Sequence, residues 1–389
     1  MNRHERRAAA KQSSDTISGV DSAATLYRVG LRQLSAGRVL DARRSCEQAL
    51  TQDAEHADAL HLMGLLSLQA GQHDHAVEWI ARAVRREPKP EYLVSLGSVL
   101  QAQGRLDEAL LAYDKAVQLR PEAAALWKKL GGALADLNRP DEAVLGYLHA
   151  LKLDPHDHDA ARKAGSLLFN LGRLEEALVQ ADLSDHLLAD QASTLQMRAL
   201  VLFGLDRPAD ALTDIMRAHA LDPADADSCN HAGRFLQRLG RDAEALSWFD
   251  RALVLRPDDL AVLFNKAHSL TGLHRFAEAF AVYDRMKTID PANTEAEWAL
   301  ALLHLLTGNF AAGWAGREVR WTMPRLPISR LDVSKPLWCG REAVDGKTVL
   351  IHMDEGLGDT IQFARYLPMV AAQGARVLLL VSDALCPLF

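Results

Sequence analysis

The chain has 389 residues, of which 49% are hydrophobic and 24% charged, a composition that excludes disorder over its whole length. Its 51 acidic side chains outnumber its 44 basic ones, and the net charge of −7 argues against a general nucleic-acid binder, which needs a basic surface. The four cysteines are scattered without a CxxC pair, so we expect neither a disulfide framework nor a metal site.

Residues 1–22 open the chain with the basic stretch MNRHERRAAAKQ, which no apolar run follows. We therefore expect a flexible basic arm rather than a secretory signal. No run of about 18 apolar residues occurs, so we expect no transmembrane helix and no membrane partner. The scattered cysteines fit a reducing compartment, and the predicted location is the cytoplasm.

Residues 23–321 are dominated by small residues that recur at intervals of 33 or 34. Another small residue follows each one after 12 positions, and a third after seven more. Small side chains at these spacings allow two antiparallel helices to cross closely, so each interval predicts one helix pair. The first set, which we call the anchors, is Gly30, Gly64, Gly97, Gly131, Gly165, Ala199, Gly233, Ala267 and Ala301. The second is Ala42, Ala76, Ala109, Ala143, Ala177, Ala211, Ala245, Ala279 and Gly313, and the third is Ala49, Ala83, Ala116, Ala150, Ser184, Ala218 and Ala252.

Other positions repeat with the same period. Turn glycines are predicted between the two helices of a pair, where positive φ is often needed, at Gly37, Gly71, Gly104, Gly172, Gly240 and Gly308. Core leucines follow the anchors by three residues, at Leu100, Leu134, Leu168, Leu202, Leu236 and Leu270. Bulky residues on the second helices are predicted to fill the space between neighbouring repeats: Ile80, Tyr113, Tyr147, Ile215, Phe249 and Tyr283.

This pattern resembles the tetratricopeptide repeat (TPR) family from about Ala23 to about Trp321. The resemblance implies a mostly α fold, a right-handed superhelical solenoid of about eight to nine helix pairs, whose first helices line a concave groove. The fifth repeat departs from the pattern, with Ser184 and Ala189 where Ala and Pro are expected, so its second helix is expected to be irregular. Stacking of neighbouring repeats is obligatory, because one pair cannot bury its own apolar face.

The predicted groove is polar and locally basic despite the acidic chain. Residues just before or after the anchors are expected to face it, and they predict a binding surface for a protein or peptide with acidic side chains. Ordinary solvated surface is the alternative. The candidate groove residues are Lys128, Lys129, Arg162, Lys163, Asn230 and Arg234.

The helical period stops after Trp321. Residues 322–346 contain three prolines and are expected to form an extended linker. Residues 347–389 predict a β-α-β unit with a parallel sheet: a strand over 347–352, a helix over 360–372 and a strand over 376–381. Glycines in the first loop let a backbone approach a ligand, and Asp359 is expected to act as the N-cap of the helix.

This last segment, with EGLGDTIQFARYLP and GARVLLLV, resembles bacterial TPR proteins that carry a GT-B glycosyltransferase domain of the heptosyltransferase type. The resemblance implies a Rossmann-like fold in which Asp359 is the general base on an acceptor hydroxyl. Gly356 and Gly358 would then shape the loop beside the substrate. Too few residues follow Lys347 for even one half of such a domain, so we expect a truncated start without the nucleotide-sugar donor site.

Three hypotheses remain open. The leading one is a protein- or peptide-binding scaffold that carries no cofactor and does not catalyse by itself. The second is a glycosyltransferase whose remaining domain lies outside this chain and which would bind a nucleotide-sugar donor only when complete. The third is a scaffold that self-associates through the β-α-β tail, because an unclosed parallel sheet exposes apolar surface and free edges.

Overall fold

The computed structural model describes residues 22–323, 335–338, 340–352 and 356–389. Residues 1–21 of the predicted basic arm and residues 324–334 and 339 of the predicted linker lie outside the described part. The chain divides into two compact units, Met1–Ser228 (unit 1) and Cys229–Phe389 (unit 2), with the division inside helix α14 (Ala226–Arg238). No helix in the described part of the chain is long and apolar enough to cross a membrane.

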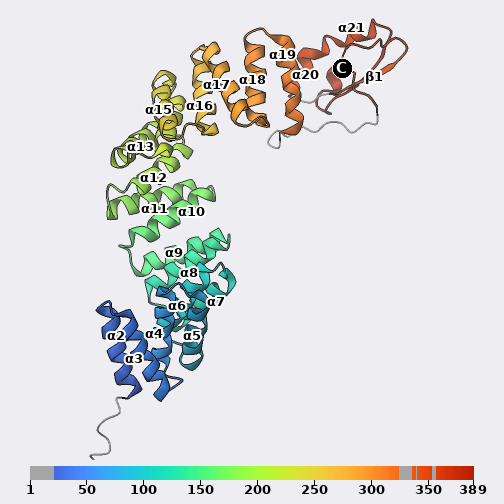
Figure 1. Ribbon diagram of the computed structural model, residues 1–389. Coiled ribbons are helices and arrows are strands. Elements are labelled where there is room, and N and C mark those ends of the chain that lie inside the picture. The colour runs from blue at the N-terminus through green and yellow to red at the C-terminus, as the bar shows by residue number, and fades with distance from the viewer. Residues whose placement is uncertain (1–21, 324–334, 339, 353–355) are drawn as a thin grey trace, which may run out of the picture. The chain divides into compact units, whose positions relative to one another are not determined.

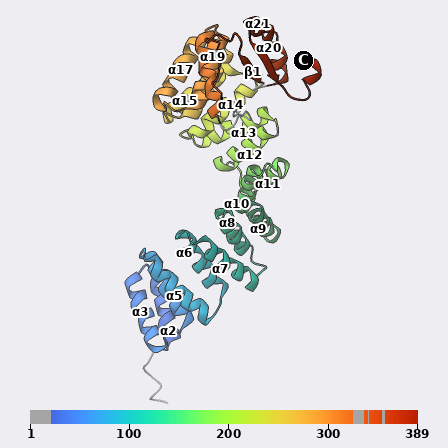
Figure 2. The ribbon, with the colours of Figure 1, turned by 90° about the vertical axis from the view of Figure 1, so that its right-hand side faces the viewer.

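Unit 1 is built from antiparallel helix pairs that follow one another in chain order (Figures 1 and 2). Its first helices each have 13 residues and its second helices 14. The first helices are α2 (Ala23–Ser35), α4 (Ala57–Gln69), α6 (Pro90–Ala102), α8 (Ala124–Asp136), α10 (His158–Asn170) and α12 (Ala192–Gly204). The second helices are α3 (Val39–Gln52), α5 (His73–Arg86), α7 (Leu106–Leu119), α9 (Pro140–Leu153), α11 (Leu174–Leu187) and α13 (Pro208–Leu221).

Unit 2 continues the helix pairs and then ends in a segment that contains two strands. Its first helices are α14, α16 (Leu260–Gly272) and α18 (Thr294–Leu306), and its second helices are α15 (Asp242–Leu255), α17 (Phe276–Ile289) and the shorter α19 (Phe310–Gly316). A 3₁₀ helix, η1 (Arg317–Thr322), ends the helical part. The described residues thus hold nine helix pairs, in agreement with the predicted solenoid of eight to nine.

The turn between the two helices of a pair needs a left-handed residue in every repeat. All six predicted turn glycines have positive φ, between 70° and 83°. The equivalent position in the other three repeats is filled by Asn138, Asp206 and His274, at φ values of 56° to 57°. Side chains with a Cβ are strained there, and Asn and Asp tolerate the strain better than most.

The anchors bring the two helices of a pair into contact. A Cβ on Gly64 would lie 2.3 Å from Ile80 Cγ1, and one on Gly233 would lie 2.4 Å from Phe249 Cε1. The small residues of the second and third sets and the core leucines are buried, as predicted. The bulky residues were predicted to fill the space between neighbouring repeats, and Ile80 does cluster with Tyr92 and Val99 of the next repeat. Ile80 and Phe249 also pack on the anchor of their own repeat.

The fifth repeat is regular, so the prediction of an irregular second helix is wrong. Helix α11 has the same 14 residues as the other second helices, and Ser184 is buried with its hydroxyl donating to the backbone oxygen of His158. The irregularity lies in the core. Ala181 occupies the position of the bulky residue, and Met197 from the next repeat fills the space, 3.0 Å from where a Cβ on Gly165 would lie.

A repeated ion pair opens six consecutive second helices. The N-cap residue of each is an arginine that pairs with a carboxylate three residues later, at 2.6–2.7 Å. The pairs are exposed to solvent, which screens their attraction, so each adds little to stability. They are Arg105–Glu108, Arg139–Glu142, Arg173–Glu176, Arg207–Asp210, Arg241–Glu244 and Arg275–Glu278.

First helices of neighbouring repeats also contact one another, notably α2 with α4, α4 with α6, and α10 with α12. Second helices of neighbouring repeats make no comparable set of contacts in the described part of unit 1. The first helices therefore lie on the inner side of the stack in this unit. We call the surface that they share the first-helix face.

The chain ends in a β-α-β segment, as predicted. Strands β1 (Thr348–His352) and β2 (Arg376–Leu380) pair in parallel, with Thr348 beside Arg376 and His352 beside Leu380. The predicted single helix between them is wrong, because α20 (Leu357–Ala364) and α21 (Leu367–Ala371) are separate. Pro368 explains the break, since a proline ring clashes with the carbonyl four residues earlier, here that of Ala364. A short 3₁₀ helix, η2 (Cys386–Leu388), follows β2.

Candidate functional site

The predicted basic residues lie on two neighbouring first helices of unit 1. Lys128 on α8 places its Nζ 2.7 Å from an oxygen of Asp157 and 3.8 Å from one of Asp159. Arg162 and Lys163 on α10 pair with Asp159 at 2.8 and 3.4 Å. The structure therefore brings three of the predicted cations around a carboxylate that the prediction did not include.

The electrostatics of this cluster favour charged partners. Burial opposes ionisation of Asp159, but hydrogen bonds and attraction from Arg162 and Lys163 outweigh it and hold the pKa of the carboxyl below its usual range. Burial likewise opposes ionisation of Asp157, and its bond to Lys128 again keeps the pKa low. Both carboxylates are thus ionised at neutral pH and neutralise part of the cationic charge.

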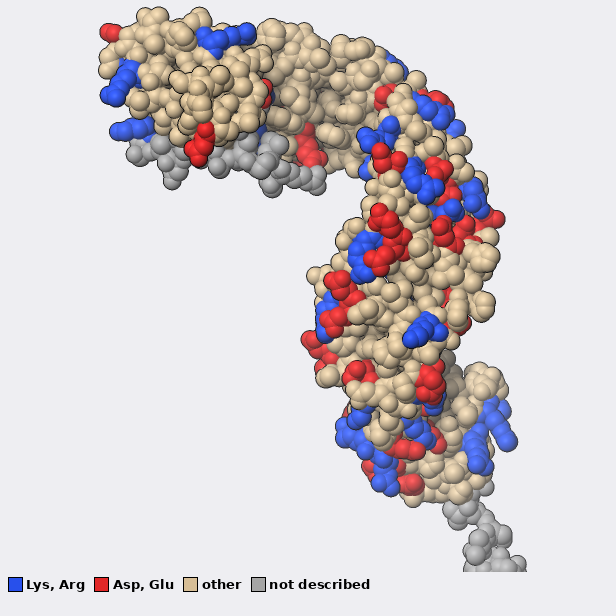
Figure 3. Space-filling model, turned by 180° about the vertical axis from the view of Figure 1, so that it is seen from behind, with Lys and Arg blue, Asp and Glu red and all other residues tan. Residues whose placement is uncertain are grey.

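Lys129, the fourth predicted cation, is exposed on α8 and forms no ion pair with any described residue. Four cations and two carboxylates leave the cluster with a net charge of about +2 on a chain whose total is −7. We call Lys128, Lys129, Arg162, Lys163 and the two aspartates the cationic cluster. Elsewhere, on the face shown in Figure 3, basic and acidic side chains alternate over much of the solenoid.

Asn230 and Arg234, the other predicted groove residues, lie on α14 in unit 2. The Asn230 side-chain oxygen accepts a hydrogen bond of 3.0 Å from the amide of Asn265 on the next first helix, α16. Gln237, about two turns further along α14, donates to the Asn265 backbone oxygen at 2.8 Å. This polar surface belongs to unit 2, whereas the cationic cluster belongs to unit 1.

A second polar group lies on the first-helix face of unit 1, around His61 on α4. His61 Nε2 lies 2.9 Å from the Ser95 hydroxyl, and its ring lies tilted by 35° against the Tyr92 ring, with the ring centres 4.6 Å apart. The Tyr92 hydroxyl donates to Asp58, which also pairs with Lys89 at 3.0 Å. Burial lowers the pKa of His61 to about 4, so this imidazole is neutral at physiological pH.

The predicted tail site differs from expectation in its local geometry. Helix α20 begins at Leu357, so Gly358 lies inside its first turn rather than in a loop. The N-cap is Gly356, which makes no side-chain cap, and Asp359 follows it by three residues as an exposed side chain. Asp359 is therefore not the N-cap that was predicted, although it lies in the first turn, where a helix favours negative charge.

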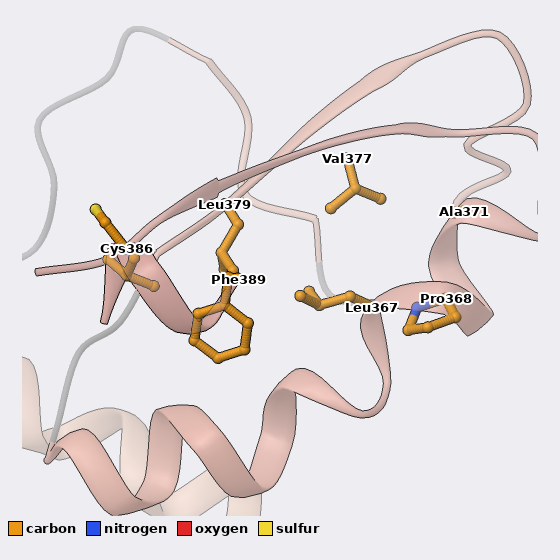
Figure 4. A pocket seen from close by; sticks show the side chains of 8 residues that line it. Leu367, Pro368, Ala371, Val377, Leu379, Cys386 and Phe389 are labelled. Carbon is orange, nitrogen blue, oxygen red and sulfur yellow. The ribbon is translucent and has the colours of Figure 1, made fainter. Parts of the chain in front are cut away.

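The β-α-β segment offers an apolar hollow instead of a polar cleft. Leu367 and Pro368 of α21 face Val377 and Leu379 of β2 across a space of about 460 Å³ that Phe389 also borders (Figure 4). The opposite face of the sheet carries Leu350, Leu378 and Leu380, which are 42–47% exposed. This exposed apolar face agrees with the reasoning behind self-association through the tail, which itself stays a prediction.

The periodic helix pairs define a helical-repeat protein of the solenoid class, in which each pair packs mainly on its sequence neighbours. Residues 33–96 match one family model described as a tetratricopeptide repeat, and residues 94–150 and 197–260 match a second model with the same description. The repeats within these matched residues are therefore tetratricopeptide repeats, as the sequence pattern indicated. The matched residues all precede the β-α-β segment, so its resemblance to a glycosyltransferase stays a prediction.

Superkiller protein 3 from Saccharomyces cerevisiae is 34% identical over 61 residues, which are 15% of this chain and 4% of that protein. The chain thus spans only a small part of this curated relative. Among solved structures, the chain is similar to YrrB, described as a TPR protein with an unusual peptide-binding site, at 24% identity and a TM-score of 0.44. That match covers 48% of this chain and 97% of YrrB.

Two further structures are similar. PilF from Pseudomonas aeruginosa is 20% identical, with a TM-score of 0.47 over 55% of this chain and 96% of that one. A tetratricopeptide repeat protein from Parabacteroides merdae is 16% identical, with a TM-score of 0.48 over 64% of this chain and 98% of that one.

Proposed function

We propose that this chain is a protein-binding scaffold whose first-helix face in unit 1 binds acidic polypeptide segments. The observation that carries the proposal is the cationic cluster, which has a net positive charge on a chain that is acidic overall. A positive surface attracts and orients an acidic segment, while the stacked first helices of unit 1 give it a continuous surface. No cofactor, metal, nucleic acid or membrane forms part of this proposal, and the proposed location is the cytoplasm.

The test uses a short fluorescent polyglutamate peptide, with polyglutamine as the uncharged probe, and measures binding by fluorescence anisotropy. Replacing Lys129 and Lys163 with glutamate weakens polyglutamate binding by about tenfold or more, because two attractions become repulsions. The matched control replaces Lys115 and Lys152, which lie exposed on the second helices α7 and α9, and leaves the affinity nearly unchanged.

Thermal unfolding followed by circular dichroism confirms that both double variants fold. Equal affinity for the wild type and the Lys129, Lys163 variant removes the first-helix face as the binding surface. Equal weakening by both double variants means that the peptide responds to the total charge rather than to the cationic cluster.

Sugar transfer is the alternative function, and one observation favours it. The parallel pairing of β1 and β2 through a helical connection is the arrangement with which a doubly wound α/β domain begins. In this proposal the exposed carboxylate of Asp359 is the general base, and Gly356 and Gly358 border the acceptor. Calorimetry with UDP-, GDP- and ADP-sugars tests it: binding favours the transferase, and no heat with any of them favours the scaffold.

A further inference from the structure

The tyrosines at the same position of two successive repeats differ in the hydrogen bonding of their hydroxyl groups. Tyr113 is fully buried, and its hydroxyl is bonded at 3.0 Å to both the Ser98 hydroxyl and the Gln101 side-chain oxygen. Tyr147 occupies the same position 34 residues later and is only 3% exposed. Its hydroxyl makes no hydrogen bond with any described residue, since the places of Ser98 and Gln101 are taken by Gly132 and Ala135.

Gly132 leaves an opening beside this hydroxyl. It lies on the first helix α8, partly exposed, and a Cβ built on it would stand 3.4 Å from the Tyr147 oxygen. The position that holds a bonding side chain in the preceding repeat is therefore an empty notch on the first-helix face. Through this notch the Tyr147 oxygen is accessible to solvent, so its hydrogen-bond partner, water or a ligand group, comes from outside the chain.

The charged side chains around the notch determine which kind of ligand group would bind there. Lys163 places its Nζ 5.9 Å from the centre of the Tyr147 ring, and Arg162 precedes it on the same face. Burial, with help from Asp159 and Asp136, raises the pKa of Tyr147 to about 12, so its hydroxyl keeps its proton and donates. Asp136 lowers the net charge of the cationic cluster from about +2 to about +1, which still suits a negatively charged acceptor for this donor.

We propose that the notch over Gly132 is an anchor subsite for a single aspartate or glutamate side chain of a bound polypeptide. The Tyr147 hydroxyl donates a hydrogen bond to the ligand carboxylate, and Lys163 and Arg162 turn toward it from their shared partner Asp159. This subsite rests on the proposed function and would fix the position of the bound polypeptide along the repeats. Among the described residues, only this repeat combines a glycine notch with the cationic cluster.

The decisive variant is Gly132→Ser, which rebuilds the arrangement of Ser98 and Tyr113. A serine there fills the notch and bonds the Tyr147 hydroxyl, so the melting temperature rises while polyglutamate affinity falls by about tenfold or more. Tyr147→Phe loses affinity to a similar extent. Tyr113→Phe is the matched control, because that hydroxyl is already satisfied within its own repeat, and it leaves the affinity unchanged.

The outcomes separate the subsite from the function on which it rests. If the Lys129, Lys163 variant loses affinity while Gly132→Ser and Tyr147→Phe bind like the wild type, the cationic cluster binds the peptide without the notch and the subsite is wrong. If polyglutamate does not bind the wild type at all, the proposed function fails and the subsite with it. A Gly132→Ser protein with an unchanged melting temperature contradicts the notch geometry independently of any ligand.

Discussion

Replacing Gly233 with alanine tests the packing at an anchor. The added Cβ would lie 2.4 Å from Phe249 Cε1 and 2.7 Å from Cζ, and the Phe249 ring is completely buried. Alanine in a helix interior is favoured over glycine by about 1 kcal/mol. Overpacking costs about 1–3 kcal/mol, and the upper end applies because the ring has no free space to enter. The expected net loss of stability is therefore about 2 kcal/mol.

Urea unfolding followed by circular dichroism measures this loss, and hydrogen exchange of α14 and α15 locates it, since long repeat arrays do not always unfold in one step. The control is Gly132→Ala, where the new Cβ makes an ordinary contact of 3.4 Å with the Tyr147 hydroxyl. That variant gains up to about 1 kcal/mol from helix propensity alone. Equal gains for both variants would show that the anchor does not require glycine.

Three further predictions concern the turns, a buried histidine and the tail. His274→Gly raises the free energy of unfolding by about 1 kcal/mol in urea titrations, because His274 holds a φ of 57° that glycine adopts without strain, and a destabilised variant contradicts this. His61 has a folded-state pKa of about 4, below its value near 6.5 in the unfolded chain, so stability present above pH 6.5 is lost as the pH falls toward 4. The His61→Gln variant is expected to lower the slope of melting temperature against pH in this range. An identical slope for the variant and the wild type refutes this prediction. If copies associate through the exposed sheet face, Leu378→Glu converts the dimer seen by light scattering into a monomer, and a wild type that is monomeric at its highest soluble concentration removes the idea.

The features that sequence predicted well are those that recur with the period. Gly64 and Ala76 could be placed because close helix crossings need small residues at fixed spacing, and Gly71 because the turn needs a positive φ. The break before Pro368 could also have been predicted, but the apolar spacing continues across it and concealed it. The roles of the tail residues remain predictions, since they depend on a resemblance rather than on a period.

The candidate site was predicted only in part, because its contacts join residues from neighbouring repeats. Lys128 was identified by its place before an anchor, whereas its partner Asp157 lies 29 residues away in the next repeat. The sequence around Tyr147 also gives no sign that its hydroxyl makes no hydrogen bond within the described part of the chain. This becomes visible only when Gly132 is compared with Ser98, its equivalent one repeat earlier.

Met197 has a consequence for how such an array tolerates rearrangement. A chain of equal modules should lose or gain one module without harm, provided that every module carries its own core. The fifth repeat does not, because the space beside Ala181 and Gly165 is filled by a side chain that the sixth repeat supplies. Recombination that removed the sixth repeat would leave a void unless the incoming neighbour also brought a long flexible side chain. The fifth and sixth repeats are therefore expected to be inherited as a pair.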